Sequence, residues 1–223
     1  MALEVTWAAD FRNLPPLPRA LWGDGDQILW ARGEALLVAS PPNVGKTTLA
    51  QRLAIARADG ASFLGFSTER TARCIYVAID RPWQARYSLA RMIDQPQADA
   101  LGERLGFVDA LPYDPIHRPN LFAADLQRLG ATTCILDSLN QATGEVVDDA
   151  AGGRIVAAIR TVLAADIDLA ILHHMRKAQP HAPPPNSLDD VVGSGKIAQA
   201  VGSVLVLWGR PGADLLTLYH RKQ

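Results

Sequence analysis

Residues 36–48 read LLVASPPNVGKTT, and this stretch decides the fold of the chain. An apolar run leads directly into Gly45-Lys46-Thr47, which matches the last three positions of the phosphate-binding pattern G-x-x-x-x-G-K-[ST]. A helical pattern follows at once in residues 47–59, TTLAQRLAIARAD. Since strand, loop and helix occur in the order that the pattern requires, the stretch predicts a nucleotide-binding loop. The alternative is a chance GKT in an ordinary strand-to-helix turn.

The expected chemistry of this loop is ATP binding with Mg²⁺. Consecutive backbone N–H groups and the helix N-terminus would hold the β-phosphate. Lys46 would reach the β- and γ-phosphates, and the hydroxyl of Thr47 would ligate Mg²⁺. The residues predicted to bind the nucleotide are Ser40, Pro41, Pro42, Asn43, Val44, Gly45, Lys46, Thr47 and Thr48.

The loop departs from the pattern at its first position, where Ser40 replaces glycine. A glycine there can adopt backbone angles that cost other residues about 1 kcal/mol or more, so we expect some strain at Ser40. Pro41 and Pro42 compensate in part, because their fixed φ lowers the freedom that the loop loses on ordering. Binding is expected to survive.

Outside the loop, short apolar runs alternate with helical patterns. Continuous rather than alternating apolar runs indicate strands that are buried on both faces, as in a parallel sheet covered by helices. A final pair of apolar runs, residues 203–209 and 214–220, flanks Arg210-Pro-Gly-Ala and predicts an antiparallel hairpin with a tight reversal. The fold class is therefore three-layer α/β. The predicted strands cover residues 34–40, 73–80, 104–110, 132–139 and 169–174, and the predicted helices 47–59, 82–94, 120–130 and 152–166.

The totals describe one globular domain with 223 residues, 48% hydrophobic and 20% charged. Residues 1–28 are expected to form an extended segment pinned to the core by Trp7, Phe11, Leu14 and Trp22, and residues 29–223 to form the domain itself. A net charge of −1 neither supports nor excludes nucleic acid. Without a signal-peptide pattern or a long apolar run, the protein is expected to be soluble and cytoplasmic, with no membrane association. Cys74 and Cys134 are expected to be reduced core residues.

Two acids end predicted strands. Asp137 follows TTCIL, and a carboxylate there could hold the water shell of Mg²⁺ beside Thr47. Asp80 follows YVAI and could act as a general base or positioner for the attacking water. Asp80 could equally be the N-cap of the next helix, with Pro82 in its first turn, and the residues alone do not decide between the two.

The pair His173-His174 ends the strand at residues 169–174. Adjacent strand residues point to opposite faces, so the two are not expected to share a metal ion. One of them is expected to act as a polar sensor near the γ-phosphate and the other to pack in the core. Two long connections, residues 141–153 and 175–196, follow strand ends, where open α/β sheets place ligands.

Residues 175–196 are either a solvated charged loop or a contact for single-stranded DNA. The available cations are Arg176, Lys177, His181 and Lys196, and the loop contains no Phe, Tyr or Trp. Contacts with the phosphate backbone are therefore expected rather than stacking on bases.

With these residues assembled, the chain resembles the RecA-fold NTPases and, among them, the RepA-type replicative helicase ATPases of plasmids and phages. The motifs that carry the resemblance are SPPNVGKTTLA, AIDRP, ILDSL, LHHMRK with the later SLDDVVGSGKIAQAVGSVLVL, and a final hairpin that ends in a basic cluster. The resemblance spans about Trp22 to Arg221. It implies a RecA-like ATPase domain over residues 29–223.

The resemblance also implies ATP hydrolysis between neighbouring subunits of a homo-oligomeric ring, commonly a hexamer, coupled to movement along single-stranded DNA. It implies that Asp137 supports Mg²⁺, that Asp80 stands in the place of the catalytic glutamate and that His174 lies near the sensor position. Arg221, with Lys222 as a second candidate, falls where a finger is supplied to the neighbouring subunit.

Several residues depart from the pattern of that family, and these differences bear on ATP hydrolysis more than on nucleotide binding. Asp80 is one methylene shorter than glutamate, Val192 replaces an arginine and Gly202 replaces an acid. A second hypothesis is therefore a nucleotide-binding regulatory or assembly module with weak hydrolysis. A third, a kinase for a small molecule, is disfavoured because neither long loop is rich in arginine.

Overall fold

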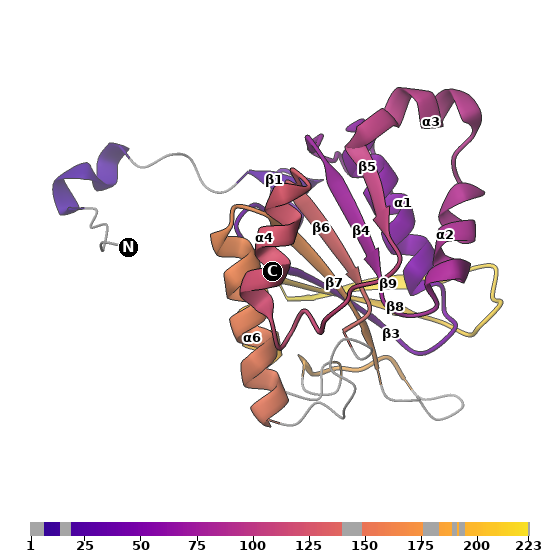
Figure 1. The fold of residues 1–223 in the computed structure, drawn as a ribbon. Helices are drawn as coiled ribbons and strands as arrows, with labels where there is room; N and C mark the ends of the chain where they lie inside the picture. Colours follow the sequence, from indigo (N-terminus) through magenta and orange to yellow (C-terminus); the bar gives the residue numbers. More distant parts are fainter. Residues whose placement is uncertain are drawn as a thin grey trace.

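The fold is a seven-stranded sheet between two layers of helices (Figure 1). The computed structural model describes residues 7–13, 19–139, 149–175, 183–188, 191 and 195–222. The strand order is β5-β4-β6-β7-β3-β8-β9, and every neighbouring pair is parallel except β8 and β9. The predicted three-layer α/β class is confirmed. The strands are β3 (Leu36–Ser40), β4 (Cys74–Ala78), β5 (Leu105–Val108), β6 (Thr133–Asp137), β7 (Asp168–His174), β8 (Ser203–Trp208) and β9 (Thr217–Lys222).

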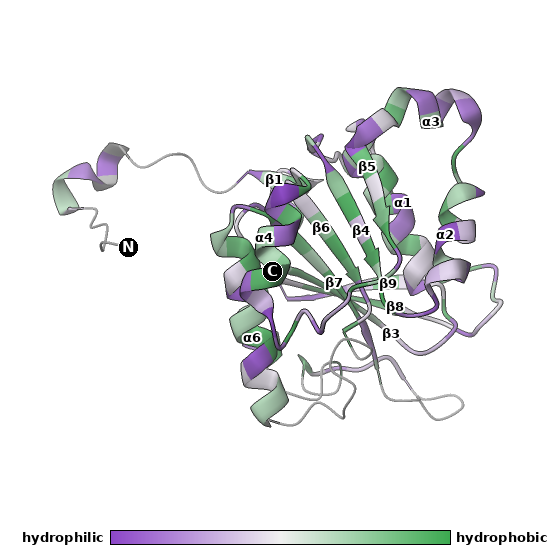
Figure 2. Cartoon of the chain, in the orientation of Figure 1, coloured by the Kyte–Doolittle hydropathy of each residue, from purple (hydrophilic) through white to green (hydrophobic). Residues whose placement is uncertain are grey.

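The continuous apolar runs explain the layering. Every residue of β3, β4 and β6 is buried, as expected for strands covered on both faces. Figure 2 shows the apolar strands enclosed by helices of mixed character. The described helices are α1 (Lys46–Asp59), α2 (Pro82–Ala90), α3 (Gln95–Leu101), α4 (Pro119–Arg128), α6 (Asp149–Ala164) and α8 (Gly195–Ala200), with the 3-10 turns η1 (Ala8–Asn13) and η2 (Gly102–Arg104).

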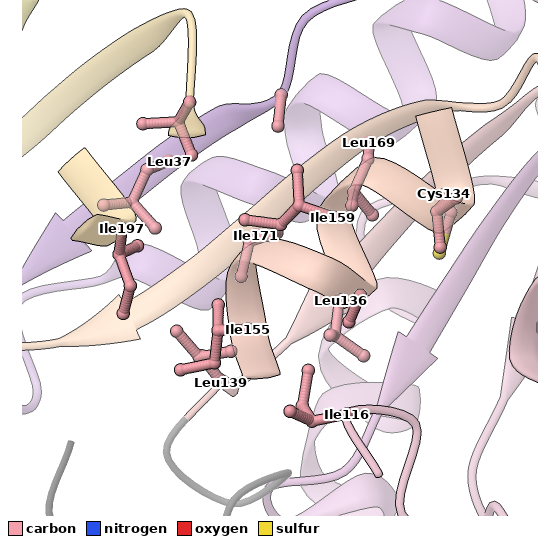
Figure 3. Packing of buried hydrophobic residues seen from close by; sticks show 14 of the residues in the cluster. Leu37, Ile116, Cys134, Leu136, Leu139, Ile155, Ile159, Leu169, Ile171 and Ile197 are labelled. Carbon is pink, nitrogen blue, oxygen red and sulfur yellow. The ribbon is translucent and has the colours of Figure 1, made fainter. Parts of the chain in front are cut away.

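Each face of the sheet carries its own hydrophobic cluster. One cluster joins α4, α6 and α8 to the sheet, and Figure 3 shows Ile155 and Ile159 of α6 packed near Leu136 and Ile171 of the strands. The other cluster joins α1 and the first hairpin to the opposite face. Cys74 and Cys134 are buried and free, as expected, and burial raises the pKa of Cys74 to about 12. No helix in the described part of the chain has the length and apolar character needed to cross a membrane.

A hairpin that the sequence reading missed precedes the sheet. It consists of β1 (Ala20–Asp24) and β2 (Gln27–Ala31). Trp22 is fully buried, and its indole N–H donates to the carbonyl of Phe63 at 3.1 Å, so it anchors the chain as expected. Trp7 does not, because it is 70% exposed and η1 lies apart from the domain (Figure 1). Leu14 and the side chain of Phe11 lie outside the described residues.

Two predicted boundaries change. The predicted helix over residues 82–94 ends at Ala90, and α3 begins after a new N-cap, where the Asp94 carboxylate accepts from the N–H of Gln97 at 2.8 Å. The C-terminal hairpin is confirmed, but its connection is not a tight turn. It runs over residues 209–216, and β9 starts only at Thr217.

A buried ion pair lies at the amino-terminal ends of the central strands, opposite the phosphate-binding loop. Arg57 of α1 is 1% exposed and donates to Asp168 and Thr133, each at 3.0 Å. These two residues begin β7 and β6. The Arg57 guanidinium also lies 5.4 Å from the centre of the Trp30 ring. Burial raises the pKa of Asp168, and the guanidinium opposes this effect. The pair is structural and lies away from the predicted site.

Candidate active site

The loop between β3 and α1 has the shape of an anion cradle. Asn43 and Gly45 are the loop residues with positive φ, at 63° and 101°. Asn is among the non-glycine residues that tolerate this region best. Gly45 is the N-cap of α1, so the loop ends at a helix N-terminus, where backbone N–H groups favour negative charge.

Ser40 is not strained, which corrects the expected cost of replacing glycine. It is the last residue of β3 and has no positive φ, and its hydroxyl donates to the carbonyl of Pro41 at 2.9 Å. The carbonyl of Ser40 accepts from the N–H of Met175, which follows β7. The unusual angles therefore fall at Asn43 and Gly45, and a serine fits the first position because the chain is still extended there.

Asp137 is the centre of the site. Its Oδ2 accepts from the Thr47 hydroxyl at 2.8 Å and from the Tyr76 hydroxyl at 2.7 Å. Its Oδ1 lies 3.5 Å from Nζ of Lys46. The carboxylate is 2% exposed, although β6, which carries it, is separated from β3 by β7. The loop and the acid are 90 residues apart in sequence and meet as predicted.

Lys46 is the clearest sign that the loop is built for an anion. It is 3% exposed, and its ammonium has no hydrogen-bond partner among the described residues. Burial lowers the pKa of Lys46, while Asp137 and Asp80 oppose that shift. Asp137 at 3.5 Å is the negative group paired with this ammonium, and that contact satisfies none of its hydrogen-bond donors. A buried ammonium that lacks acceptors is costly, so the site fits the phosphates of ATP, which would supply them.

The oxygens beside this cation fit Mg²⁺. The Thr47 hydroxyl and the Asp137 carboxylate are hard oxygen donors, the type that this ion prefers. Since Mg²⁺ keeps most of its waters and uses one or two protein oxygens together with substrate phosphates, a small donor set suffices. Thr47 and Asp137 are therefore the residues that would hold the ion.

Asp80 faces the site and is not a helix cap. The N-cap of α2 is Arg81, with φ of 47°, and no side chain caps the helix. The Asp80 carboxylate instead lies 3.3 Å from Nε2 of His174. Both side chains are partly exposed, at 26% and 29%, so water can reach them. The helix-cap interpretation of Asp80 is therefore wrong, and its role as a base stays a prediction.

The two histidines have different surroundings. Burial and the nearby Lys46 lower the pKa of His174, and the Asp80 contact opposes them. His173 is 4% exposed and pairs in register with Ala39 of β3. Burial is the main cause that lowers the pKa of His173 to about 4, with further contributions from Lys46 and His174. His173 therefore stays neutral at neutral pH within the core, while His174 faces the site.

Arg221 lies at an irregular point on the edge strand β9. Pairing with β8 steps from His220 to Lys222, so Arg221 is the extra residue of a bulge. Its guanidinium lies 4.5 Å from the centre of the Tyr219 ring. Bulges at sheet edges re-aim side chains. Lys222 is occupied differently, because its ammonium donates to the carbonyls of Ala198 and Val201 at the end of α8. Lys222 is thus a helix cap rather than a second finger.

Sequence reasoning missed several residues near the site. Tyr76 was hidden inside an apolar strand, and only the polarity of its hydroxyl distinguished it. Trp83 and Tyr87 are 65% and 64% exposed and stack with ring centres 6.3 Å apart on α2, the helix that follows Asp80. Gln51 of α1 donates to the carbonyl of Ala85, so α2 lies against the helix of the phosphate loop. The i, i+4 spacing of Trp83 and Tyr87 was the feature of the sequence that could have predicted their stacking.

The C-terminal hairpin also approaches the loop. A Cβ placed on Gly45 would lie 3.9 Å from Cδ1 of Leu216, which directly precedes β9. The predicted DNA contact, residues 175–196, lies largely outside the described residues, including Arg176, Lys177 and His181. Lys196 is described and is exposed on α8.

The parallel sheet, the phosphate loop and the acid two strands away define a P-loop NTPase with a RecA-like fold. The family model described as "AAA domain" matches residues 1–180, and the chain belongs to this family. A solved KaiC-like protein from the hyperthermophilic archaeon Pyrococcus horikoshii is similar over 93% of this chain and 89% of its own, with a TM-score of 0.60 and 15% identity. At that identity the likeness concerns the fold. No curated protein matches the sequence.

Proposed function

We propose that the protein binds ATP at this loop and hydrolyses it. The observation that supports this most is the meeting of Lys46, Thr47 and Asp137 beside the Asp80–His174 pair. These residues come from α1, β6, β7 and the segment that follows β4, and their side chains gather at the carboxyl ends of the parallel strands, where open α/β sheets bind ligands. A cation, two oxygen donors and a water-accessible carboxylate are the groups that phosphoryl transfer to water needs.

The proposed reaction uses each group once. Lys46 pairs with the β- and γ-phosphates. Asp80 accepts a proton from a water molecule whose oxygen attacks the γ-phosphorus, and the bond from that phosphorus to the β–γ bridging oxygen breaks. His174 holds the Asp80 carboxylate in place through the contact between Nε2 and Oδ2. When bound, Mg²⁺ neutralises charge on the phosphates, and Thr47 and Asp137 would hold it.

The nucleoside end of ATP has a candidate surface on α2. Trp83 and Tyr87 present stacked, exposed rings on a helix that packs against α1. Aromatic faces stack on bases without regard to base identity, and each such contact contributes about 1–3 kcal/mol. The pair would therefore add affinity for a nucleotide without choosing between ATP and GTP.

Assembly and DNA belong to the finer part of the proposal. Arg221 lies at an edge-strand bulge, which would suit a finger presented to the ATP of a neighbouring subunit in a ring. The cations of residues 175–196 would contact the phosphates of single-stranded DNA, in line with a RepA-type helicase role in replication or recombination. Both ideas rest on the resemblance described above and on the position of Arg221.

The test combines turnover with oligomeric state. Purified protein is assayed for ATP hydrolysis with and without single-stranded DNA, and its mass is measured by light scattering with and without a non-hydrolysable ATP analogue. The proposal expects turnover that DNA stimulates and a mass that increases with the analogue. Turnover that DNA leaves unchanged at every salt concentration would contradict only the proposed action on DNA. An absence of turnover would contradict the proposed ATPase activity.

One observation favours the second candidate, a nucleotide-binding assembly module with weak hydrolysis. Asp80 is short for a catalytic base and is already engaged by His174. Asp80→Glu distinguishes the two candidates, because a longer carboxylate should raise turnover if reach is limiting. ATP binding with negligible turnover, unchanged in Asp80→Glu, would favour the assembly module.

A further inference from the structure

Tyr76 is the residue of the site that no motif includes. It lies on β4 and its Cα pairs with Ile135, two residues before Asp137 on β6. Its side chain extends along the sheet, and the hydroxyl donates to Oδ2 of Asp137 at 2.7 Å. The contact is fully buried, so water does not compete for it. Tyr76 therefore reaches the cation-site acid from the neighbouring strand.

The ring of Tyr76 is held firmly. It is 0% exposed and stacks on the Phe107 ring of β5, with centres 5.8 Å apart and planes 5° from parallel. Burial is the main cause that raises the pKa of Tyr76 well above its usual value, and Asp137 adds to it. The Tyr76 hydroxyl thus keeps its proton and acts as a fixed donor to Asp137.

The two oxygens of Asp137 have separate tasks. Oδ2 accepts from both Tyr76 and Thr47, whereas Oδ1 faces Lys46. Once Lys46 pairs with phosphates and the Thr47 oxygen takes part in binding a cation, Tyr76 is the hydrogen-bond donor among the described residues that stays on the Asp137 carboxylate. The contact from Tyr76 would then set the direction in which Oδ1 points.

We propose that Tyr76 is a positioning residue for the divalent cation: its hydroxyl fixes the Asp137 carboxylate so that Oδ1 faces the bound nucleotide. This inference rests on the proposed function. It assigns Tyr76 no contact with ATP and no part in proton transfer. Its effect should therefore appear in the dependence on the cation and not in the binding of the nucleotide alone.

The test is Tyr76→Phe, which removes one oxygen and keeps the ring and its stacking on Phe107. Binding of a fluorescent ATP analogue is measured in EDTA and across a series of Mg²⁺ concentrations, and binding of Mn²⁺ is followed by electron paramagnetic resonance. We expect unchanged affinity in EDTA and about tenfold weaker binding of Mn²⁺ in the presence of nucleotide, since a buried hydrogen bond to a charged group is lost.

Tyr113→Phe is the matched control. The Tyr113 hydroxyl donates to Asp125 at 2.6 Å, so the control removes the same type of bond away from the site. It should leave Mn²⁺ binding unchanged. A Tyr76→Phe protein that binds Mn²⁺ as tightly as wild type would overturn the inference and show that the hydroxyl serves packing alone.

A double variant provides an independent measurement. In an Asp137→Ala background the acceptor of the Tyr76 hydrogen bond is gone, so adding Tyr76→Phe should weaken Mn²⁺ binding no further. Equal, additive losses in both backgrounds would also overturn the inference. Wild-type protein that binds no nucleotide at all would contradict the proposed function instead, which keeps the two failures apart.

Discussion

Nε2 of His174 lies 3.3 Å from Oδ2 of Asp80, although 94 residues separate the two in sequence. His174 ends β7 and Asp80 lies two residues after the end of β4, and these are the strands on either side of β6, which carries Asp137. The pair therefore spans the strand of the cation-site acid. The Asp80 carboxylate thus contacts His174 and does not cap α2, whose N-cap is Arg81.

Replacing Asp80 tests its role as the proton acceptor. Asp80→Asn keeps the size and a hydrogen bond to His174 but cannot accept the proton, so kcat should fall about 100-fold or more. The Kd for ATP should change less than about threefold. Single-turnover hydrolysis and equilibrium binding measure the two effects. Asp109→Asn, on an exposed acid paired with Arg86, is the control. Equal turnover in both variants would rule out Asp80 as the base.

Arg221 can be tested by mixing two inactive variants. Arg221→Ala should lower turnover about 1,000-fold if the guanidinium acts on a neighbour's ATP. Lys46→Ala lacks a working loop but keeps Arg221. Mixed rings should regain activity, because an intact loop of one variant then meets the arginine of the other. A mixture as inactive as its components, under conditions where the subunits associate, would contradict action in trans.

Stability should fall in mild acid because of His173. Its folded pKa of about 4 lies below the ordinary 6.5, so the unfolded chain binds more protons between these values. The free energy of unfolding is therefore highest above pH 6.5, falls as the pH drops, and levels off below pH 4. At pH 5 the loss of unfolding free energy that His173 causes is about 2 kcal/mol.

The measurement is urea unfolding of wild type and His173→Gln at pH 7.5 and pH 5. Glutamine does not titrate, so the variant should lose less stability on acidification by about that amount. Identical losses in the two proteins would show that His173 is accessible to protons in the folded state.

The buried Arg57–Asp168 pair should matter for stability and not for the site. Arg57→Met leaves Asp168 buried without its partner, and we expect a loss of about 3–5 kcal/mol. Arg86→Met, which removes an exposed pair with Asp109, should cost less than about 1 kcal/mol. Urea unfolding compares them. A similar, small change in both would mean that water reaches Asp168.

The layered fold was predictable because the strands are continuous apolar runs, and this pattern depends on local sequence alone. The β1–β2 hairpin was predictable in principle, since Asp24-Gly25 separates two runs that each contain a tryptophan. It was missed because the adjoining prolines suggested one extended segment. The exposed position of Trp7 carries no local signal.

The site was predictable where a residue ends a strand, as Asp137 and His174 do, or closely follows one, as Asp80 does. The part of the site that depends on a contact between two strands was not predictable. Tyr76 reaches Asp137 only because β4 and β6 are adjacent and in a particular register, which the sequence does not state. The relaxed conformation of Ser40 likewise depends on where β3 ends and where positive φ falls, at Asn43 and Gly45.

The most direct test of the account is ATP turnover by wild type and Lys46→Ala, with ATP affinity measured in parallel. Lys46 is the buried cation that no described residue pairs by a hydrogen bond. We predict measurable hydrolysis by wild type, and for the variant a loss of turnover and at least about tenfold weaker binding in a folded protein. Equal turnover in the two proteins, or none in wild type with or without single-stranded DNA, would contradict the proposed ATPase.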